Sequence, residues 1–133
     1  MPRKRRLRLT ARTADRYRLY SESVQSTDME IAFIRRVFRT HNPYAPLLLR
    51  EDFCGTALLS CDWVKAGPQN RAVAVDLDPE PLDYCRRHYL TALEPHQARR
   101  LRLLQANVLS VRTAPVDVIA ALNFSFCVFK RRS

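Results

Sequence analysis

Short apolar segments alternate with helical patterns along most of this 133-residue chain, and this alternation limits the fold more than any other feature. A helix is predicted over 56–66, where Gly67 followed by Pro68 marks its end. Another helix is predicted to start at Asp78, an N-cap, with Pro79 at the first helical position. The apolar segments have the length of buried strands and comprise 47–51, 72–76, 101–105 and 116–122. This order predicts an α/β fold with a parallel sheet and right-handed crossovers.

The predicted helices carry apolar residues at helical spacing. The helix after Asp78 places Leu82, Cys85 and Tyr89 on one side. Before the first strand, 13–25 reads as a short polar helix, and Thr27 with Glu30 forms a capping box that opens a longer one. That longer helix is predicted to have a single apolar face, made of Met29, Phe33, Ile34, Val37 and Phe38.

The net charge of +10 is concentrated at the front of the chain, where residues 1–12 contain six basic residues and no acid. Such a run predicts a disordered, solvated arm. Its alternative role is nucleic-acid binding through phosphate contacts, but no aromatic side chain for base stacking lies among these arginines. No apolar stretch is long enough to span a bilayer, so no membrane partner is expected.

The cysteines show neither metal-ligand nor disulfide spacing. Cys54, Cys61, Cys85 and Cys127 form no C-x-x-C pair, and the histidines show no ligand spacing near them. Because no signal peptide is evident, buried thiols in a reducing cytoplasm are expected. No metal site is predicted.

Polar side chains follow the predicted strands at the edge where an open parallel sheet binds its ligands. Glu51 and Asp52 end the first strand, Asp76 ends the second 25 residues after Glu51, and Asn107 follows the third. Asp76 either accepts hydrogen bonds from a ribose diol or caps the next helix. Gly55 allows close backbone approach. Because no G-x-G-x-x-G is present, a nucleoside without phosphates is favoured over a dinucleotide.

Four stretches in order resemble the first four motifs of class I S-adenosylmethionine-dependent methyltransferases: "LREDFCGTALLSCDWV", "AVAVDLDPEPLDYCRRHYL", "QANV" and "VDVIAALNFSFCVFK". They are most similar to a branch that carries an "REDFCGT" first motif, and "DRYRLYSESVQ" resembles its lead-in. The resemblance covers about residues 15–130. It implies a Rossmann-like parallel sheet with flanking helices, and S-adenosylmethionine as the cofactor.

The resemblance also implies a set of cofactor-binding positions. Glu51 matches the acid that opens the first motif, E/D-x-G-x-G-x-G, and Phe53, Gly55 and Ala57 occupy its three glycine positions. Asp76 matches the ribose-binding acid of the second motif. The remaining matches are Leu77 beside Asp76, then Asn107 and Val108 near the adenine, and Asn123 with Phe124 near the methyl group. Asn123 could equally be a turn-forming amide, and Phe124 a core residue.

The family's sheet has seven strands, whereas about four are predicted here in the order 3-2-1-4. We therefore expect residues 13–133 to be the N-terminal, cofactor-binding half of a truncated methyltransferase domain. The open edge of the fourth strand predicts self-association. The function expected is methyl transfer to an acceptor that the sequence does not identify, with no catalytic residue assigned, because positioning supplies most of the effect. The alternative is a non-catalytic basic fragment that binds nucleic acid or a protein partner.

Overall fold

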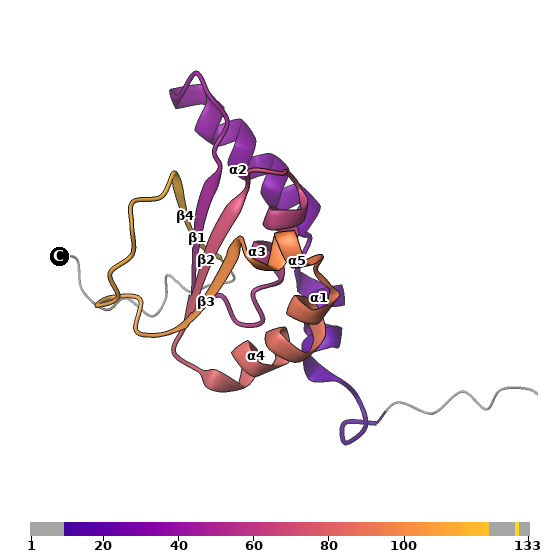
Figure 1. Ribbon diagram of the computed structural model, residues 1–133. Coiled ribbons are helices and arrows are strands. Elements are labelled where there is room, and N and C mark those ends of the chain that lie inside the picture. Colours follow the sequence, from indigo (N-terminus) through magenta and orange to yellow (C-terminus); the bar gives the residue numbers. More distant parts are fainter. Residues whose placement is uncertain (1–9, 123–129, 131–133) are drawn as a thin grey trace, which may run out of the picture.

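The computed structural model describes residues 10–122 and 130 of the chain, which comprise a parallel sheet and the helices around it (Figure 1). The strands are β1 (Leu48–Asp52), β2 (Arg71–Asp76), β3 (Leu101–Gln105) and β4 (Val118–Ala121). The α-helices are α1 (Arg16–Val24), α2 (Thr27–His41), α3 (Leu58–Lys65), α4 (Pro79–Tyr84) and α5 (Pro95–Ala98). A π-helical turn, η1 (Cys85–Tyr89), and a 3₁₀ turn, η2 (Leu90–Ala92), continue α4.

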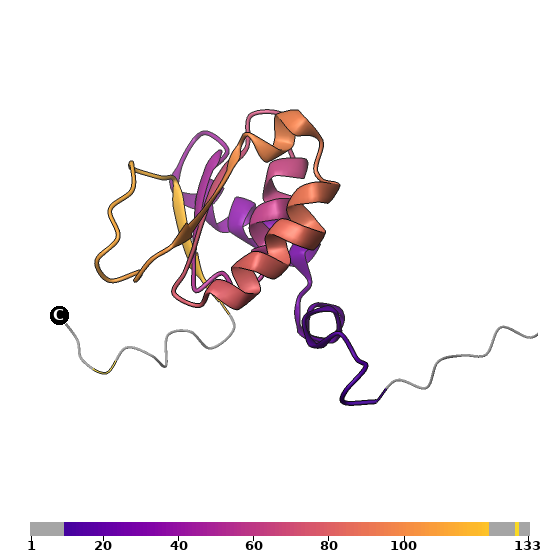
Figure 2. The same ribbon diagram turned by 60° about the horizontal axis from the view of Figure 1, so that its bottom comes forward.

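The four strands are parallel and lie in the order β3-β2-β1-β4, which confirms the predicted order. Glu51 on β1 pairs with Ala74 on β2 and Ala120 on β4, so the carboxyl ends of the strands meet at one edge of the sheet. The connections place α3, α4 and α5 on the same face (Figure 2). The predicted parallel α/β fold with flanking helices is therefore present.

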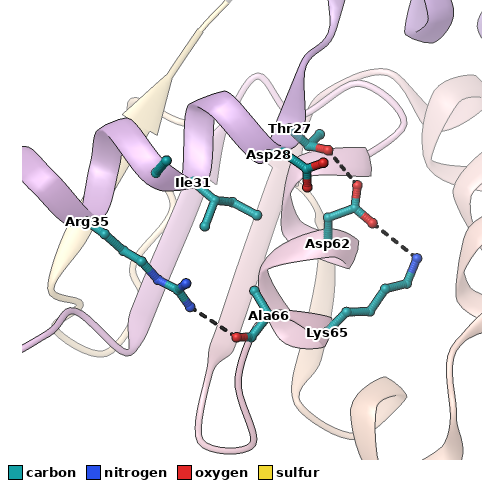
Figure 3. Close-up of a pocket in the computed structure, with 8 residues that line it drawn as sticks. Thr27, Asp28, Ile31, Arg35, Asp62, Lys65 and Ala66 are labelled. Atoms are coloured by element: carbon teal, nitrogen blue, oxygen red, sulfur yellow. Dashed lines mark hydrogen bonds and ion pairs between the residues drawn. The ribbon is translucent and has the colours of Figure 1, made fainter.

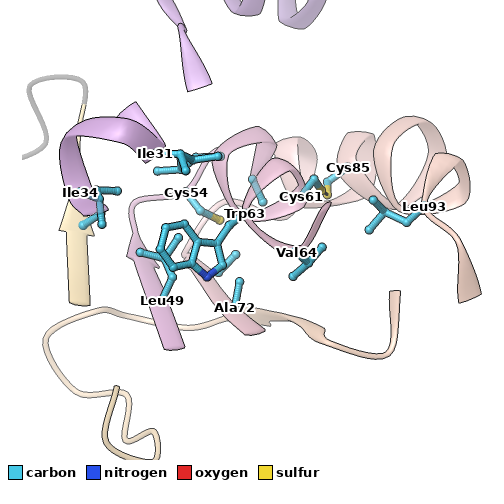
Figure 4. Close-up of a cluster of buried hydrophobic side chains, with 14 of the residues drawn as sticks. Ile31, Ile34, Leu49, Cys54, Cys61, Trp63, Val64, Ala72, Cys85 and Leu93 are labelled. Atoms are coloured by element: carbon cyan, nitrogen blue, oxygen red, sulfur yellow. Dashed lines mark hydrogen bonds between the residues drawn. The ribbon is translucent and has the colours of Figure 1, made fainter. Parts of the chain in front are cut away.

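The hydrophobic core lies between the helices and this face of the sheet (Figure 4). Trp63, Leu49 and Leu59 are fully buried there, and the Trp63 indole N–H donates to the Leu47 carbonyl at 3.1 Å. Leu59 and Trp63, which lie one turn apart on α3, both face inward. Leu82 and Cys85 are also fully buried, with Tyr89 packed against the core, as the helical spacing predicted.

On the opposite side of the sheet, the connection between β3 and β4, residues 106–117, takes the place of a helix (Figure 2). Arg50 points to this side from the centre of β1 and is only 8% exposed. Its guanidinium pairs with Asp52 at 2.7 Å, and it donates to the Thr113 hydroxyl at 3.3 Å and the Val108 carbonyl at 3.1 Å. Arg50 therefore fastens the connection to the sheet.

Two predictions about α2 are wrong. Ser26, not Thr27, is the N-cap, and it makes no side-chain capping bond; the Thr27 hydroxyl instead donates to Asp62 on α3 at 2.7 Å. The buried residues of α2 are Ile31 and Ile34, whereas most of the predicted apolar face is exposed: Met29 (73%), Phe33 (57%) and Val37 (42%). Ile31 and Ile34 lie one turn apart and pack into the core, so α2 buries this side of the helix rather than the whole of the predicted apolar face.

The other element boundaries differ from prediction by a few residues. The first strand runs one residue further, to Asp52, and α3 begins at Leu58 because residues 53–57 form a turn. Asp15 caps α1, which is shorter than the predicted 13–25. Asp78 caps α4 with its carboxylate on the Glu80 amide at 3.0 Å, as predicted.

Candidate functional site

The turn between β1 and α3 has an unusual backbone. Phe53, Gly55 and Ala57 have φ angles of 56°, 55° and 55°, and they are the residues with positive φ in the described ranges, 10–122 and 130. A left-handed conformation costs an ordinary L-residue about 1–2 kcal/mol. These are the three glycine positions of the motif matched by sequence, so the turn keeps a glycine-like backbone although two of its glycines are replaced.

Backbone hydrogen bonds tie this turn to the end of β2. The Cys54 amide donates to the Val75 carbonyl at 3.0 Å, and the Gly55 amide donates to Asp76 Oδ2 at 2.7 Å. Within the turn, the Ala57 amide donates to the Cys54 carbonyl at 2.8 Å. A Cβ placed on Gly55 would meet no atom within 4 Å, so open space faces this glycine. A ligand at this edge of the sheet could therefore approach the backbone of the turn closely.

Glu51 is buried beneath the turn, on the helix-covered face of the sheet. Its Oε2 accepts from the Ser60 amide at 3.1 Å and from the Ser60 hydroxyl at 2.6 Å. Since the α3 N-cap is Ala57, which has no capping group, Glu51 satisfies an amide at the start of this helix instead. Burial raises the pKa of Glu51 from 4.5 to about 7, and the charges of Glu30 and Asp76 add to that rise.

Asp76 lies at the end of β2 and already holds two backbone amides. Its Oδ2 accepts from Gly55, and its Oδ1 accepts from the Asp78 amide at 3.0 Å. An ionised carboxylate has about four acceptor positions, so two remain for a ligand such as a vicinal diol. Asp76 therefore shapes the turn and keeps capacity for ribose. The next residue, Leu77, is 66% exposed at the same edge.

The third strand end contributes a short turn beside Asp76, whose carbonyl accepts from the Ala106 amide at 2.9 Å. Asn107 is exposed, and its side-chain oxygen accepts from the Leu109 amide at 2.9 Å. The Val108 carbonyl accepts from Arg50. Both residues predicted to line the adenine thus lie at the same sheet edge as Asp76, and the hydrogen bonds described above join them to the protein itself.

The predicted site residues of β1, β2 and β3 are thus gathered at one edge, whereas other predicted features lie outside the described residues. These are Asn123 and Phe124 of the fourth motif, Cys127, and residues 1–9 of the basic arm. The roles assigned to them stay predictions.

Two polar residues at the end of α1 and the start of α2 were not singled out by the sequence as ligand-binding groups. Gln25 follows α1 and Glu30 lies in the first turn of α2; the Gln25 Oε1 and Glu30 Oε2 atoms are buried without a hydrogen-bond partner. Arg50 was also missed, although an arginine within an apolar strand is an unusual choice for a buried position. Because Glu30 fits the pattern of a capping box, the sequence did not indicate that one of its carboxylate oxygens is buried.

The described cysteines are packing residues, as predicted. Cys54, Cys61 and Cys85 are free thiols in the core, with the sulfurs of the latter two 3.8 Å apart. Burial raises the pKa of the Cys54 thiol well above its ordinary value, which leaves it protonated and unreactive. Residues 10–122 and 130 contain no cluster of His, Cys, Asp and Glu that could hold a metal ion.

A pocket of about 450 Å³ lies between α2 and α3, but its polar groups are used within the protein (Figure 3). Asp62 accepts from Thr27 and pairs with Lys65 at 3.1 Å, while Arg35 donates to the Ala66 carbonyl at 3.2 Å. These contacts join the two helices. We therefore place the candidate site at the turn rather than in this pocket.

A second hollow of about 600 Å³ lies between α2 and β4, the edge strand of the described sheet. Its walls include Phe33, Val37 and Phe38 of α2, on the side of that helix that the core does not bury.

In the described part of the chain, no helix has the length and apolar character required to cross a membrane.

Solved methyltransferase structures share this arrangement of sheet and helices. CalS10, an amino pentose methyltransferase from Micromonospora echinaspora solved with SAM bound, superposes with a TM-score of 0.64 and 17% identity over 86% of this chain and 44% of its own. The sugar N-methyltransferase KedS8 from Streptoalloteichus sp. ATCC 53650 gives 0.64 and 21%, over 88% and 43%. The glycopeptide N-methyltransferase MtfA gives 0.56 and 15%, over 77% and 45%.

These similarities establish the Rossmann-like methyltransferase fold. The chain spans less than half the length of each of these three proteins. No protein-family model matches the chain, and no curated protein matches it by sequence.

Proposed function

We propose that this chain binds S-adenosylmethionine at the turn between β1 and α3, as the cofactor-binding part of a methyltransferase. One observation carries the proposal: three left-handed residues, Phe53, Gly55 and Ala57, lie in the turn directly after β1, the strand that carries Glu51 and ends with Asp52. Two of them hold this conformation against their own preference. The two most similar structures described above, which share the sheet, are methyltransferases, and one of them was solved with SAM bound.

The division of roles follows from the contacts. Gly55 lets the ligand approach the backbone, since no atom faces its Cα within contact distance. Asp76 keeps two acceptor positions for the two ribose hydroxyls. Asn107 and Val108 would lie along the adenine, with the exposed side chain of Leu77 offering apolar contact. The proposed site therefore recognises a nucleoside without a phosphate group.

The charge at this edge suits a cationic ligand. Glu51 and Asp76 have no ion-pair partner among the described residues, and neither has Glu30. S-adenosylmethionine carries a positive sulfonium and a positive ammonium group. Burial is the main cause of the raised pKa of Glu51, and a ligand with these charges would offset the smaller contribution from the charges of Glu30 and Asp76.

When bound, the cofactor supplies a methyl group on a good leaving group. The part of the reaction left to the protein is therefore to hold and orient the two reactants. The turn and Asp76 would fix the nucleoside, so that its position relative to the sheet is set by the fold. The residues that choose the acceptor are not assigned.

Calorimetry with S-adenosylhomocysteine tests the proposal directly. We expect saturable binding by the folded chain, and Asp76→Ala should weaken it by roughly 1–3 kcal/mol, the range for a hydrogen bond to a charged group. Asp78→Ala is the matched control, because it removes the α4 cap without touching the predicted ribose contact. Absence of binding at millimolar ligand by a folded sample would contradict the proposal.

Because Asp76 also holds Gly55, a second comparison separates ligand contact from turn stability. The wild-type chain should bind adenosine more tightly than 2′,3′-dideoxyadenosine, which lacks both ribose hydroxyls. In Asp76→Ala this preference should disappear. A preference that persists in the variant would show that Asp76 acts on the turn alone.

A further inference from the structure

Three exposed arginines lie on the side of the sheet away from α3, α4 and α5 (Figure 2). Arg71 begins β2, Arg102 is on β3, and Arg112 is in the connection between β3 and β4. Within residues 10–122 and 130, none of these three guanidinium groups has a hydrogen bond or an ion-pair partner. They therefore keep all of their N–H donors for a ligand.

The alternation of side chains along the strands places Arg71 and Arg102 on one face of the sheet. Ala72 and Leu101 are partners in the register of β2 and β3, and both contribute to the core on the helix-covered face. Successive side chains of a strand point to opposite faces, so Arg71 and Arg102 point away from the core. Their exposure agrees with this orientation.

The third arginine is brought to the same side by its neighbour in the chain. Thr113 follows Arg112, and its hydroxyl accepts from the guanidinium of Arg50 at 3.3 Å. Arg50 is on β1, in the row of the sheet that also contains Arg102, because both are in register with the same residue of β2. We call the set of Arg71, Arg102 and Arg112 the arginine face.

The carboxylates on this side of the described sheet are already used within the protein. Asp52 pairs with Arg50 at 2.7 Å, and Asp117 accepts from the Leu47 and Leu48 amides at 2.8 Å each. The sequences of the four strands and of residues 106–117 contain no aromatic residue. The arginine face is therefore positively charged, without aromatic side chains on which bases could stack.

We infer that the arginine face binds the phosphate backbone of a double-stranded nucleic acid. A guanidinium group presents planar paired donors that match a phosphate group. The three arginines come from three separate segments rather than one turn, which suits an anion that repeats along a polymer. Because no base-stacking group accompanies them, contacts to the backbone of a duplex are favoured over binding of a single strand. The net charge of +10 attracts such a polyanion at long range.

This inference goes beyond the proposed function and does not depend on it. The cofactor is proposed to bind at the turn after β1, whereas the arginine face involves the start of β2, the middle of β3 and the connection 106–117. The chain would therefore have two separate surfaces, one for a nucleoside and one for a nucleic acid.

The test measures the affinity of the full chain for a fluorescently labelled DNA duplex of about 20 base pairs, by anisotropy, between about 50 and 200 mM salt. In the variant, Arg71, Arg102 and Arg112 are all replaced by glutamine. Each lost phosphate contact should reduce the slope of log affinity against log salt by about 0.9, which is about 2.7 for the three. At about 50 mM salt, affinity should fall by more than about tenfold.

The matched control replaces Arg36, Arg39 and Arg87 by glutamine. These arginines are exposed on α2 and η1, so the control loses the same three charges from other surfaces. It should weaken duplex binding by less than about threefold, because only the long-range attraction is reduced. The basic residues 1–12 are unchanged in all three proteins. Thermal melts followed by circular dichroism check that both variants are folded, and both should bind S-adenosylhomocysteine as the wild type does.

Three results would overturn the inference. The first is an equal loss of duplex binding in the variant and the control, since binding would then reflect net charge alone. The second is the absence of duplex binding by the folded wild-type chain. The third is binding to a single strand, or to vesicles that contain anionic lipid, with no binding to the duplex. None of these results involves the cofactor, so the binding of S-adenosylhomocysteine decides the proposed function separately.

Discussion

Replacing Glu51 by glutamine should make the protein more stable at neutral pH, although it removes a buried hydrogen-bonding acid. Glu51 is 4% exposed, and its Oε2 accepts two bonds from Ser60. Burial is the main cause of its raised pKa, with smaller contributions from the charges of Glu30 and Asp76; the Ser60 bonds act in the opposite direction. Glutamine keeps an acceptor for Ser60 but carries no charge.

The sign and size follow from linkage. The pKa of Glu51 is about 7 in the folded protein against an ordinary value of 4.5, so the folded state binds the proton more tightly. The contribution of Glu51 to the free energy of unfolding is therefore fully present below pH 4.5 and is lost as the pH rises through about 7. At about 1.4 kcal/mol per pH unit, the loss is on the order of 3 kcal/mol. Glu51→Gln should not show this loss.

Urea denaturation followed by circular dichroism at pH 4.5, 5.5, 6.5 and 7.5 measures the effect. The free energy of unfolding of Glu51→Gln should equal that of the wild type at pH 4.5 and exceed it by up to about 3 kcal/mol at pH 7.5. Glu22→Gln, which removes an exposed carboxylate, is the control and should show no such divergence. A constant difference between Glu51→Gln and wild type across this range would refute the reasoning.

Three further changes test other features of the fold. Gly55→Ala should lower the free energy of unfolding in urea by about 1–2 kcal/mol, because the added Cβ meets no atom but must adopt φ near 55°; no loss would mean that the turn is relaxed. Arg50→Ala should lower the free energy of unfolding by about 3 kcal/mol and speed proteolysis within 106–117, since it leaves the largely buried Asp52 without its ion-pair partner; unchanged cleavage would contradict the fastening role. We also propose that the chain self-associates through β4, whose Ile119 is 59% exposed, so Ile119→Lys should lower the sedimentation coefficient, and a wild-type monomer at high concentration would disprove this.

The sheet could be predicted from the sequence because its signals are local. Apolar segments of strand length, separated by helices with recognisable starts such as Asp78, permit few topologies once crossovers must be right-handed. The acids at the strand ends could be placed at one edge for the same reason. The sequence alone allows Asp76 to be either a ribose ligand or a helix cap. In the structure its carboxylate accepts from the Asp78 and Gly55 amides, while its role toward ribose stays a prediction.

The details of the site could not be predicted because they depend on tertiary contacts. A phenylalanine and an alanine do not indicate a left-handed backbone, so Phe53 and Ala57 showed only that glycines were missing. Glu51 reaches the start of α3 because the turn brings Ser60 over it. Glu30 and Gln25 look like ordinary surface residues in an amphipathic pattern, and only the packed structure shows their buried oxygens.

The turn after β1 also has a consequence for the order in which the chain folds. A glycine-rich turn samples left-handed angles in the unfolded chain, whereas Phe53 and Ala57 seldom do. The bonds that hold the turn come from Val75 and Asp76, about twenty residues further along. The turn should therefore form together with β1–β2 pairing, after the two strands have met. Formation of the proposed nucleoside site is then part of the cooperative folding step, and a mutation in β2 that slows folding should delay formation of that site equally.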